Sequence, residues 1–249
     1  MPFLTVVLPA FNEADNLPKT IESVHGYLRR RQLDAEILVV DDGSTDRTAE
    51  VLERLRGRYP ELRVLRHPVN RGYGAALRTG FAGSTGEWVH LMDSDGQFDI
   101  ADLDRFLPLT QGHEAVLGYR LRRQDPFYRR INAWLWGRVV GFILGVRVRD
   151  LDCAFKLMDG SLLRRFPLRS DGAGISAELL FMMQKWRVRR VEVGVEHYPR
   201  VSGRSTGANP RVILRALGEL LEMRRRDPRS EPVPATAPMA NAERRHAGG

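Results

Sequence analysis

The chain has 249 residues, of which 43% are hydrophobic and 28% are charged. This length suits one large domain or two small ones, and the composition excludes a chain that is disordered for most of its length. Lysine and arginine total 39 against 31 aspartates and glutamates, a net charge of +8 at pH 7. Such an excess is typical of proteins that bind an anionic partner, such as nucleic acid, a membrane surface or a phosphorylated substrate.

Cysteine content and the N-terminus bear on the cellular compartment. The sequence contains one cysteine, Cys153, so it can form no intrachain disulfide and no cysteine-rich zinc site. A single free thiol fits a reducing cytosol. The first residues lack the basic segment and the long apolar run of a signal peptide, and no segment approaches the roughly 20 apolar residues that span a bilayer. We therefore expect a cytoplasmic protein.

Short apolar runs alternate with segments of helical spacing in the first half of the sequence. The runs are β-branched and apolar on both faces, as buried parallel strands are, and lie at residues 3–8, 37–40, 62–65 and 88–92. Helical spacing follows at residues 15–30, 46–59 and 74–83. Asn12 is the expected N-cap of the first helix. This alternation predicts an α/β fold with a right-handed, parallel, doubly wound sheet.

The second half continues the pattern less regularly. Two more strands are predicted, at residues 115–117 and 187–195, and three more helices, at residues 127–146, 176–186 and 212–226. Residues 227–249 are rich in Pro, Ala, Arg and Glu without periodicity, which predicts a disordered tail. We therefore expect a single folded domain that ends near residue 226.

Acidic residues follow three of the predicted strands. Asn12 and Glu13 come after the first strand, the acidic run 41–46 after the second, and the run 93–97 after the fourth. Because ligands of open α/β sheets bind outside the carboxyl ends of the strands, these loops mark a candidate site. Carboxylates gathered at one edge repel each other and favour a cation, and oxygen ligands indicate Mg²⁺ or Mn²⁺ rather than zinc.

Each loop also has an ordinary interpretation. Asp-Gly-Ser and Ser-Asp-Gly are common turn sequences, and Asn12 with Glu13 is also consistent with a simple helix start. The glycine pattern of an NAD-type Rossmann site is absent, and so is the terminal glutamate of a calcium-binding loop. The placement of all three loops after successive strands favours a functional site.

The order and spacing of these motifs resemble the family 2 glycosyltransferases of GT-A fold, across residues 3–205. The motifs are Phe11-Asn12-Glu13, Val40-Asp41-Asp42-Gly43-Ser44-Thr45-Asp46, Asn70-Arg71-Gly72-Tyr73-Gly74-Ala75-Ala76 and Asp93-Ser94-Asp95-Gly96-Gln97. Within the family the sequence is most similar to the dolichyl-phosphate and polyprenyl-phosphate sugar synthases, through residues 118–120, 150–156 and 200–205. The resemblance implies a Rossmann-like GT-A domain of residues 1–226, with a nucleotide-sugar part of about residues 1–118 and an acceptor part of about residues 119–226.

The resemblance also implies roles for residues on the donor side. The nucleotide sugar would be bound by Pro9, Phe11, Glu13, Asp42, Asn70, Gly72 and Asp93. The metal would be held by Asp93, Asp95 and Gln97, with Asp95 on the diphosphate. A divalent cation there would neutralise the charge that builds on the nucleoside diphosphate leaving group.

Direct displacement by the acceptor inverts the anomeric carbon, and the acceptor decides which side chains are needed. A hydroxyl acceptor needs a general base, for which Asp150 and Asp152 are candidates. A phosphate acceptor is already anionic and needs cations, for which guanidinium groups are suited. Arg120 matches the family's acceptor-phosphate arginine, and with Asp95, Asp150 and Asp152 it completes the candidate catalytic residues. Further candidates for binding the acceptor phosphate or the diphosphate are Arg129, Arg130, Arg200, Arg204 and Ser205.

The sequence departs from the family pattern in three ways. The usual Ser-Gly-Phe is Cys153-Ala154-Phe155, and the lysine that often follows the last serine is Thr206, which leaves loop closure to Arg204. The C-terminal transmembrane helices of many bacterial relatives do not follow. The sequence therefore predicts a peripheral membrane enzyme or one docked to a membrane partner protein.

The predicted helix at residues 127–146 allows two interpretations. Its tryptophans, including Trp134 and Trp136, stand beside arginines, which is typical of a helix that lies in a membrane interface. The alternative is a helix packed on the sheet with its tryptophans in the core. Residues 119–149 contain eight arginines and one acidic residue, Asp125, so much of the chain's positive charge gathers where a phosphorylated lipid would approach.

The leading hypothesis is a metal-dependent, inverting transferase that moves a sugar from a UDP- or GDP-sugar to a polyprenyl phosphate at a membrane surface. One alternative is the same chemistry on a soluble or saccharide hydroxyl acceptor. A nucleic-acid-binding protein is suggested by charge alone, because the sequence lacks an aromatic RNA-binding pair and a recognition-helix signature, and we expect no nucleic acid partner. An inactive relative is disfavoured by the intact carboxylates.

Overall fold

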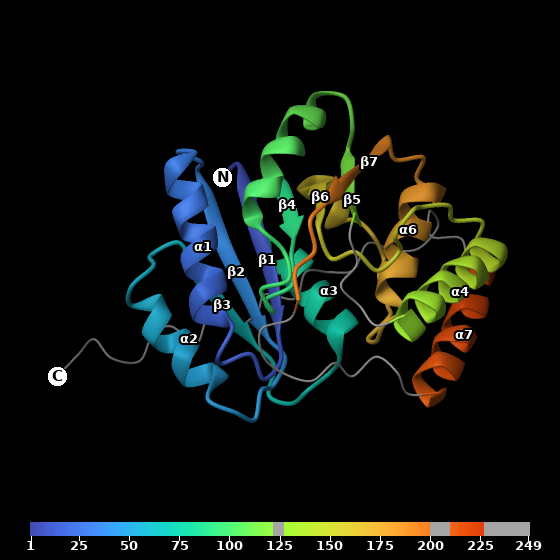
Figure 1. The fold of residues 1–249 in the computed structure, drawn as a ribbon, viewed down its shortest axis with the longest axis horizontal. Helices are drawn as coiled ribbons and strands as arrows, with labels where there is room; N and C mark the ends of the chain where they lie inside the picture. The colour runs from blue at the N-terminus through green and yellow to red at the C-terminus, as the bar shows by residue number, and fades with distance from the viewer. Residues whose placement is uncertain (122–126, 200–209, 227–249) are drawn as a thin grey trace.

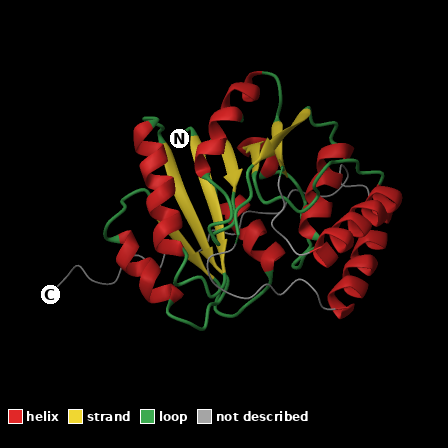
Figure 2. Cartoon of the chain, viewed as in Figure 1, coloured by secondary structure: helices red, strands yellow, loops and turns green. Residues whose placement is uncertain are grey.

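A seven-stranded sheet with helices on both faces forms the core of the computed structural model, which describes residues 1–121, 127–199 and 210–226 (Figure 1, Figure 2). The strand order is β3-β2-β1-β4-β6-β5-β7. The strands are β1 (Leu4–Ala10), β2 (Ala35–Asp41), β3 (Leu62–Arg66), β4 (Trp88–Leu91), β5 (Ala115–Arg120), β6 (Lys156–Asp159) and β7 (Arg190–Val195). The helices are α1 (Leu17–Arg30), α2 (Thr48–Arg56), α3 (Tyr73–Gly83), α4 (Phe127–Leu144), α5 (Gly160–Leu163), α6 (Ile175–Lys185) and α7 (Pro210–Arg225).

Six of the strands form parallel pairs, and the predicted mostly parallel α/β sheet is confirmed. β1 pairs with β2 and β4, β2 with β3, and β5 with β7, all in parallel. One strand departs from the parallel arrangement, because β6 lies antiparallel between β4 and β5. This strand is short, and it begins with the buried Lys156, which donates to the carbonyl oxygen of Cys153. Because β6 has only four residues and begins with a lysine, its sequence does not show the apolar pattern that predicts a buried strand.

The sheet is buried on both faces, as the continuous apolar runs predict. In β1, Val7 packs into one core with Leu77 and Phe81 of α3, while Val6 and Leu8 pack into a second core on the other face. Helices α6 and α7 add to the first core and α1 to the second. The side chains that point to either face of the strand are apolar because helices cover both faces of the sheet.

The beginning of α1 differs from the prediction. The helix starts at Leu17 with Asn16 in the N-cap position, so the assignment of Asn12 as the cap is wrong. Asn12 has a φ of 57°, in the left-handed region that Asn tolerates better than most residues. The last strand also begins later than predicted, at Arg190, because Arg187 has a φ of 55° and ends the preceding turn. Two 3₁₀ helices, Ile100–Arg105 and Leu107–Gln111, connect β4 to β5 and were not predicted.

Helices α4, α6 and α7 gather beside the sheet, with α4 and α7 next to each other (Figure 1). Among the residues described, none of these helices combines the length and the apolar character needed to cross a bilayer. The predicted tail, residues 227–249, lies outside the described residues.

Candidate active site

The parallel register brings the predicted site loops to one edge of the sheet. Ala10 at the end of β1 is aligned with Asp41 at the end of β2, and β4 ends beside Val7. The loop after β4 is joined directly to β1, because Ser94 Oγ donates to the carbonyl oxygen of Pro9 at 2.7 Å. The acidic loops after β1, β2 and β4 are therefore neighbours in space, as expected from their place after successive strands.

The loops after β1 and β2 hold each other through Asn12. Its Oδ1 accepts from the backbone N of Thr45 at 2.8 Å and of Asp46 at 3.3 Å. The next residue, Glu13, is 8% exposed, and its backbone N donates to Thr48 Oγ1 at 3.0 Å. The family motif Phe11-Asn12-Glu13 thus fixes the mouth of the site by hydrogen bonds, while Phe11 itself is 41% exposed beside it.

Asp42 supports the loop that follows β3. It is 3% exposed, and its carboxylate accepts from the backbone N of Arg71 at 3.0 Å and of Gly72 at 2.8 Å. His67 Nδ1 lies 2.6 Å from Asp42 Oδ1, and His67 Nε2 lies 2.8 Å from Thr79 Oγ1. His67 was not predicted as a site residue, although it follows β3 as the acidic residues follow their strands. Asp42 and His67 together fix residues 70–74, the predicted nucleotide loop.

The turn at Gly72 requires glycine. Its φ is +102°, and a Cβ there would lie 2.4 Å from the carbonyl oxygen of Asp171. Gly74 approaches the same segment closely, since a Cβ on it would lie 2.4 Å from the carbonyl oxygen of Ser170. The backbone of residues 70–74 is therefore set by contacts on both sides, with Asn70 exposed at its start.

Asp93 and Asp95 form the acidic centre of the site. Tyr73, at the start of α3, donates from its hydroxyl to Asp93 Oδ1 at 3.0 Å. Burial, and next the charge of Asp95, raises the pKa of Asp93 to about 7. Burial also raises the pKa of Tyr73 well above its ordinary value, and the charges of Asp93, Asp152 and Asp95 raise it further. Asp152 thus lies close enough to Tyr73 for its charge to act on the hydroxyl that donates to Asp93.

The donor set at this centre fits a divalent cation with oxygen ligands. Two adjacent carboxylates, one with a raised pKa, are stabilised by a cation between or beside them. The backbone N of Gln97 donates to Asp95 Oδ1 at 3.1 Å, and its Nε2 donates to the carbonyl oxygen of Tyr198 at 3.1 Å. Within the described ranges there is no group of three or more His, Cys, Asp or Glu side chains suited to a metal. Mg²⁺ or Mn²⁺ would therefore take its remaining ligands from water or from the phosphates of a bound ligand.

On the acceptor side the structure pairs two of the predicted catalytic residues. Arg120 Nε lies 2.6 Å from Asp150 Oδ2, and Arg120 Nη2 lies 2.7 Å from Asp150 Oδ1. The two side chains are 10% and 8% exposed. A bidentate pair of this kind fixes the guanidinium plane of Arg120 and occupies both oxygens of Asp150. Asp152, in contrast, is exposed.

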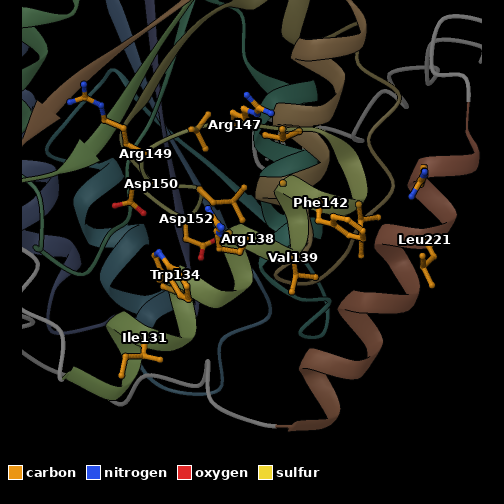
Figure 3. Close-up of a pocket in the computed structure, with 18 residues that line it drawn as sticks. Ile131, Trp134, Arg138, Val139, Phe142, Arg147, Arg149, Asp150, Asp152 and Leu221 are labelled. Carbon is orange, nitrogen blue, oxygen red and sulfur yellow. The ribbon is translucent and has the colours of Figure 1, made fainter.

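A cavity of about 1580 Å³ opens beside this pair, between α4, residues 146–152 and α7 (Figure 3). Asp150 and Asp152 lie at one end of the cavity, and Trp134, Phe142 and Leu221 extend its apolar lining. The arginines that line it are Arg138, Arg147, Arg149 and Arg224. The cavity therefore combines the two carboxylates at one end with guanidinium groups and apolar side chains along its lining.

Helix α4 combines features of both interpretations given to its sequence. Val140 and Leu144 are buried in the core. Trp134 is 64% exposed and Phe142 87% exposed, and Arg138 stacks on the Trp134 ring at 5.6 Å. Trp136 is partly buried against the core. The helix thus packs on the protein with one face and presents aromatic and basic side chains to the outside with another.

The remaining predicted phosphate-binding residues cannot be placed by their side chains. Arg129 and Arg130 belong to the first turn of α4, and their side chains are outside the described part of the structure. Arg200, Arg204 and Ser205 lie outside the described residues.

The protein has the predicted GT-A fold. It resembles the solved structure of mannosyl-3-phosphoglycerate synthase from Rubrobacter xylanophilus, with a TM-score of 0.67 at 20% identity, over 89% of this chain and 74% of that one. It also resembles glucosyl-3-phosphoglycerate synthase from Mycobacterium tuberculosis, with a TM-score of 0.66 at 23% identity, over 89% of this chain and 80% of that one.

The sequence pattern of glycosyl transferase family 2 matches residues 5–172, and the chain belongs to this family. Human dolichyl-phosphate beta-glucosyltransferase is 28% identical over 214 residues, 77% of this chain and 66% of the relative. Dodecaprenyl-phosphate galacturonate synthase of Rhizobium johnstonii is 29% identical over 229 residues, 89% of this chain and 67% of the relative. A dolichyl-phosphate beta-glucosyltransferase of Trichomonas vaginalis is 33% identical over 171 residues, 62% of this chain and 52% of the relative. The chain thus spans about half to two thirds of these relatives' length, and the predicted family resemblance is confirmed.

Proposed function

We propose that the protein transfers a sugar, with inversion, from a nucleoside diphosphate sugar to a polyprenyl phosphate at a membrane surface, and that it uses Mg²⁺ or Mn²⁺. The observation that carries this proposal is the meeting of two different environments at one edge of the sheet. The Tyr73 hydroxyl donates to Asp93, the charge of Asp152 acts on the same hydroxyl, and Asp152 lines the apolar, arginine-rich cavity. A polar donor and a lipid phosphate acceptor need such a junction.

The donor assignment rests on the loops that surround Asp93 and Asp95. The exposed Phe11 ring offers a surface for a nucleobase, and the turn at residues 70–74 offers backbone groups to the nucleotide. A bound cation on Asp93, Asp95 and Gln97 would stabilise the negative charge on the diphosphate leaving group. Glucosyl-3-phosphoglycerate synthase from M. tuberculosis has been solved in complex with Mn²⁺ and UDP-glucose, which is consistent with this assignment.

The acceptor assignment rests on the Arg120–Asp150 pair. A hydroxyl acceptor must lose a proton to a general base, and both oxygens of Asp150 are already occupied by Nε and Nη2 of Arg120. A phosphate acceptor has no such proton to lose at neutral pH, and it needs an oriented cation. Asp150 lines the cavity and orients Arg120. The relatives from human and R. johnstonii are named as enzymes that act on lipid phosphates.

The membrane assignment rests on the outer face of α4. Trp134 and Phe142 are exposed, and Arg138 and Arg147 lie on the same cavity. Aromatic and basic side chains together suit the headgroup region of an anionic bilayer, from which a polyprenyl chain would enter the apolar groove. Peripheral attachment through this face is part of the proposal.

A donor and acceptor panel tests the proposed function. The full chain is incubated with Mn²⁺, with each of several UDP- and GDP-sugars, and with either a short-chain polyprenyl phosphate or a soluble saccharide. Products are identified by mass spectrometry. We expect a glycosyl polyprenyl phosphate from one donor class. Transfer to the saccharide alone would overturn the acceptor assignment, and a lack of transfer from every nucleotide sugar would overturn the reaction.

A further inference from the structure

A buried carboxylate on α6, outside the donor and acceptor loops, joins three segments of the chain. Glu178 is 0% exposed, and it accepts from the backbone N of Arg169 at 2.9 Å and of Ser170 at 2.8 Å. Arg226, which directly follows α7, donates from Nη1 to Glu178 Oε1 at 2.6 Å and from Nη2 to the carbonyl oxygen of Pro167 at 2.7 Å. Glu178 and Arg226 therefore fix the connection between α5 and α6 to the end of α7.

The connection held by Glu178 supports the glycine turn at the start of α3. The carbonyl oxygen of Asp171 accepts from the backbone N of Gly74 at 2.9 Å and of Ala75 at 3.2 Å. The same oxygen is the atom that a side chain at Gly72 would strike. Asp42 holds this turn from the site side, and Asp171 holds it from the opposite side. The position of the predicted nucleotide loop thus depends on residues 169–171.

Helix α3 makes a second connection to the same segment. Arg78 Nη1 donates to the carbonyl oxygen of Arg169 at 2.5 Å, and Arg78 Nη2 lies 3.0 Å from Asp171 Oδ1. Its side chain is 28% exposed, so Arg78 reaches the segment from the surface while Glu178 reaches it from the interior. Arg78 thus fixes residues 169–171 to α3, and Glu178 fixes residues 169–170 to α6.

We propose that Glu178 and Arg226 are positioning residues for the donor site, and that through them the docking of α7 controls nucleotide affinity. The proposal rests on the proposed function, in which residues 70–74 bind the donor. Helix α7 lines the acceptor cavity with Leu221 and Arg224, and it ends next to Arg226. A ligand or surface that stabilises α7 in this cavity therefore strengthens donor binding, and the donor strengthens acceptor-side binding to the same extent.

The proposed effect arises from the free-energy cost of leaving the Glu178 carboxylate buried without the Arg226 guanidinium. Removal of one partner of a buried ion pair leaves an uncompensated charge, which the surrounding structure relieves by moving or by admitting water. The groups that share this carboxylate are the backbone N–H groups of Arg169 and Ser170. Movement there withdraws the Asp171 carbonyl from the turn at Gly74.

Nucleotide binding to the full chain tests the proposal. The dissociation constants of UDP and GDP are measured with Mn²⁺ by isothermal titration calorimetry, for wild type, Arg226→Met, Arg226→Lys and Arg78→Met. The matched control is Arg164→Met, because Arg164 Nη1 also binds backbone carbonyls, of Ser84 at 3.3 Å and Gly86 at 3.1 Å, but before β4 at the opposite edge of the sheet. We expect the dissociation constant to be about tenfold larger in Arg226→Met and Arg78→Met than in wild type. It should lie between these values in Arg226→Lys and stay at the wild-type value in Arg164→Met.

Hydrogen exchange provides a readout that needs no ligand. Exchange at the amides of Gly74 and Ala75 is expected to rise about tenfold in Arg226→Met at a temperature where both proteins are folded, and to stay unchanged in Arg164→Met. Unchanged exchange at these two amides, or equal weakening of nucleotide binding in Arg226→Met and Arg164→Met, would overturn the proposal. A wild-type protein that binds neither UDP nor GDP would instead refute the proposed donor, and the exchange data would still decide the positioning role.

Discussion

The edge of the sheet that we propose binds the donor, the donor edge, differs in construction from the cavity that we propose binds the acceptor, the acceptor cavity. At the donor edge, short loops are joined to each other by backbone and side-chain hydrogen bonds, and Asp42 and Glu13 are almost fully buried. The acceptor cavity is lined by helices, by arginines and by exposed apolar side chains such as Phe142, which is 87% exposed. A polar ligand of defined shape suits a preorganised site, whereas a long apolar chain suits an open groove.

The two regions meet at the junction of β4 and β6. His90 of β4 is paired with Leu157 of β6, and its ring lies edge-on to Phe155, with 4.3 Å between the ring centroids. Tyr73 and Asp93 lie on the donor side of this junction, and Arg120 and Asp150 on the acceptor side. The difference between the regions can therefore be tested one side at a time.

The largest effect is expected at the donor edge. Replacement of Asp95 by alanine, Asp95→Ala, removes one of the two adjacent carboxylates and should lower the turnover number by about 10³-fold, because charge on the leaving group loses its stabilisation. Turnover is measured as release of nucleoside diphosphate with Mn²⁺ present. Asp34→Ala, an exposed aspartate just before β2, is the control and should keep wild-type activity. Near-normal turnover in Asp95→Ala would refute the metal assignment.

The acceptor side should respond differently to the loss of its two charged groups. Arg120→Met should lower turnover on a polyprenyl phosphate by about 10²-fold, because the oriented cation is lost. Asp150→Asn removes the negative partner of Arg120 and should cost about tenfold. Steady-state rates with saturating donor give both values, and thermal unfolding shows whether each variant is folded. A much larger loss in Asp150→Asn than in Arg120→Met would indicate that Asp150 is a general base, as a hydroxyl acceptor requires.

The junction itself should be sensitive to pH through His90. Burial lowers the pKa of His90 to about 3, whereas a histidine in the unfolded chain has a pKa near 6.5. Between these values the unfolded state binds a proton that the folded state does not. The contribution of His90 to the free energy of unfolding is thus fully present above about pH 6.5 and is lost as the pH drops toward 3. The loss is about 2 kcal/mol at pH 5.

Urea unfolding at pH 7.5 and pH 5 measures this change. His90→Leu should lose about 2 kcal/mol less than wild type between the two pH values. His113→Leu, at a half-buried histidine in the turn before β5, should behave like wild type. An equal loss of stability in wild type and His90→Leu would show that His90 does not carry the pH dependence.

The smallest effect is expected on membrane attachment. Trp134→Ala combined with Phe142→Ala removes two exposed aromatic side chains from α4 and should weaken partition into anionic liposomes by about tenfold. Liposome sedimentation measures the bound fraction. Val69→Ala, at a residue that is 64% exposed beside the donor loops, is the control. Partition that is unchanged by the double substitution would exclude α4 as the membrane-binding face.

The sequence predicted the structure correctly where a strand or loop depends on residues close together along the chain. Apolar runs on both faces of a strand predicted β1, β2, β3 and β4, because a strand covered by helices on both sides has no polar face. The carboxylates at Asp42, Asp93 and Asp95 were predicted to gather, and the parallel register does bring their loops to one edge. Order along the chain is sufficient for these conclusions.

The sequence did not predict contacts between segments that lie far apart along the chain. The sequence pattern favours Asn12 as a helix cap, but Asn12 bonds a loop more than 30 residues away. Arg120 and Asp150 have separate predicted roles, but they form one pair. Strand β6, the support of Asp42 by His67, and the link from Glu178 to the turn at Gly74 had no signal in the sequence pattern.

The sequence by itself therefore determined the α/β class, the family and the acidic edge, since these follow from hydrophobic period and from motifs after strands. The tertiary structure decided which charges are paired, which tryptophan of α4 is exposed, and which buried groups hold the donor loop. Those properties depend on where the chain folds back on itself, and the distance between two residues in sequence does not set the distance between them in space.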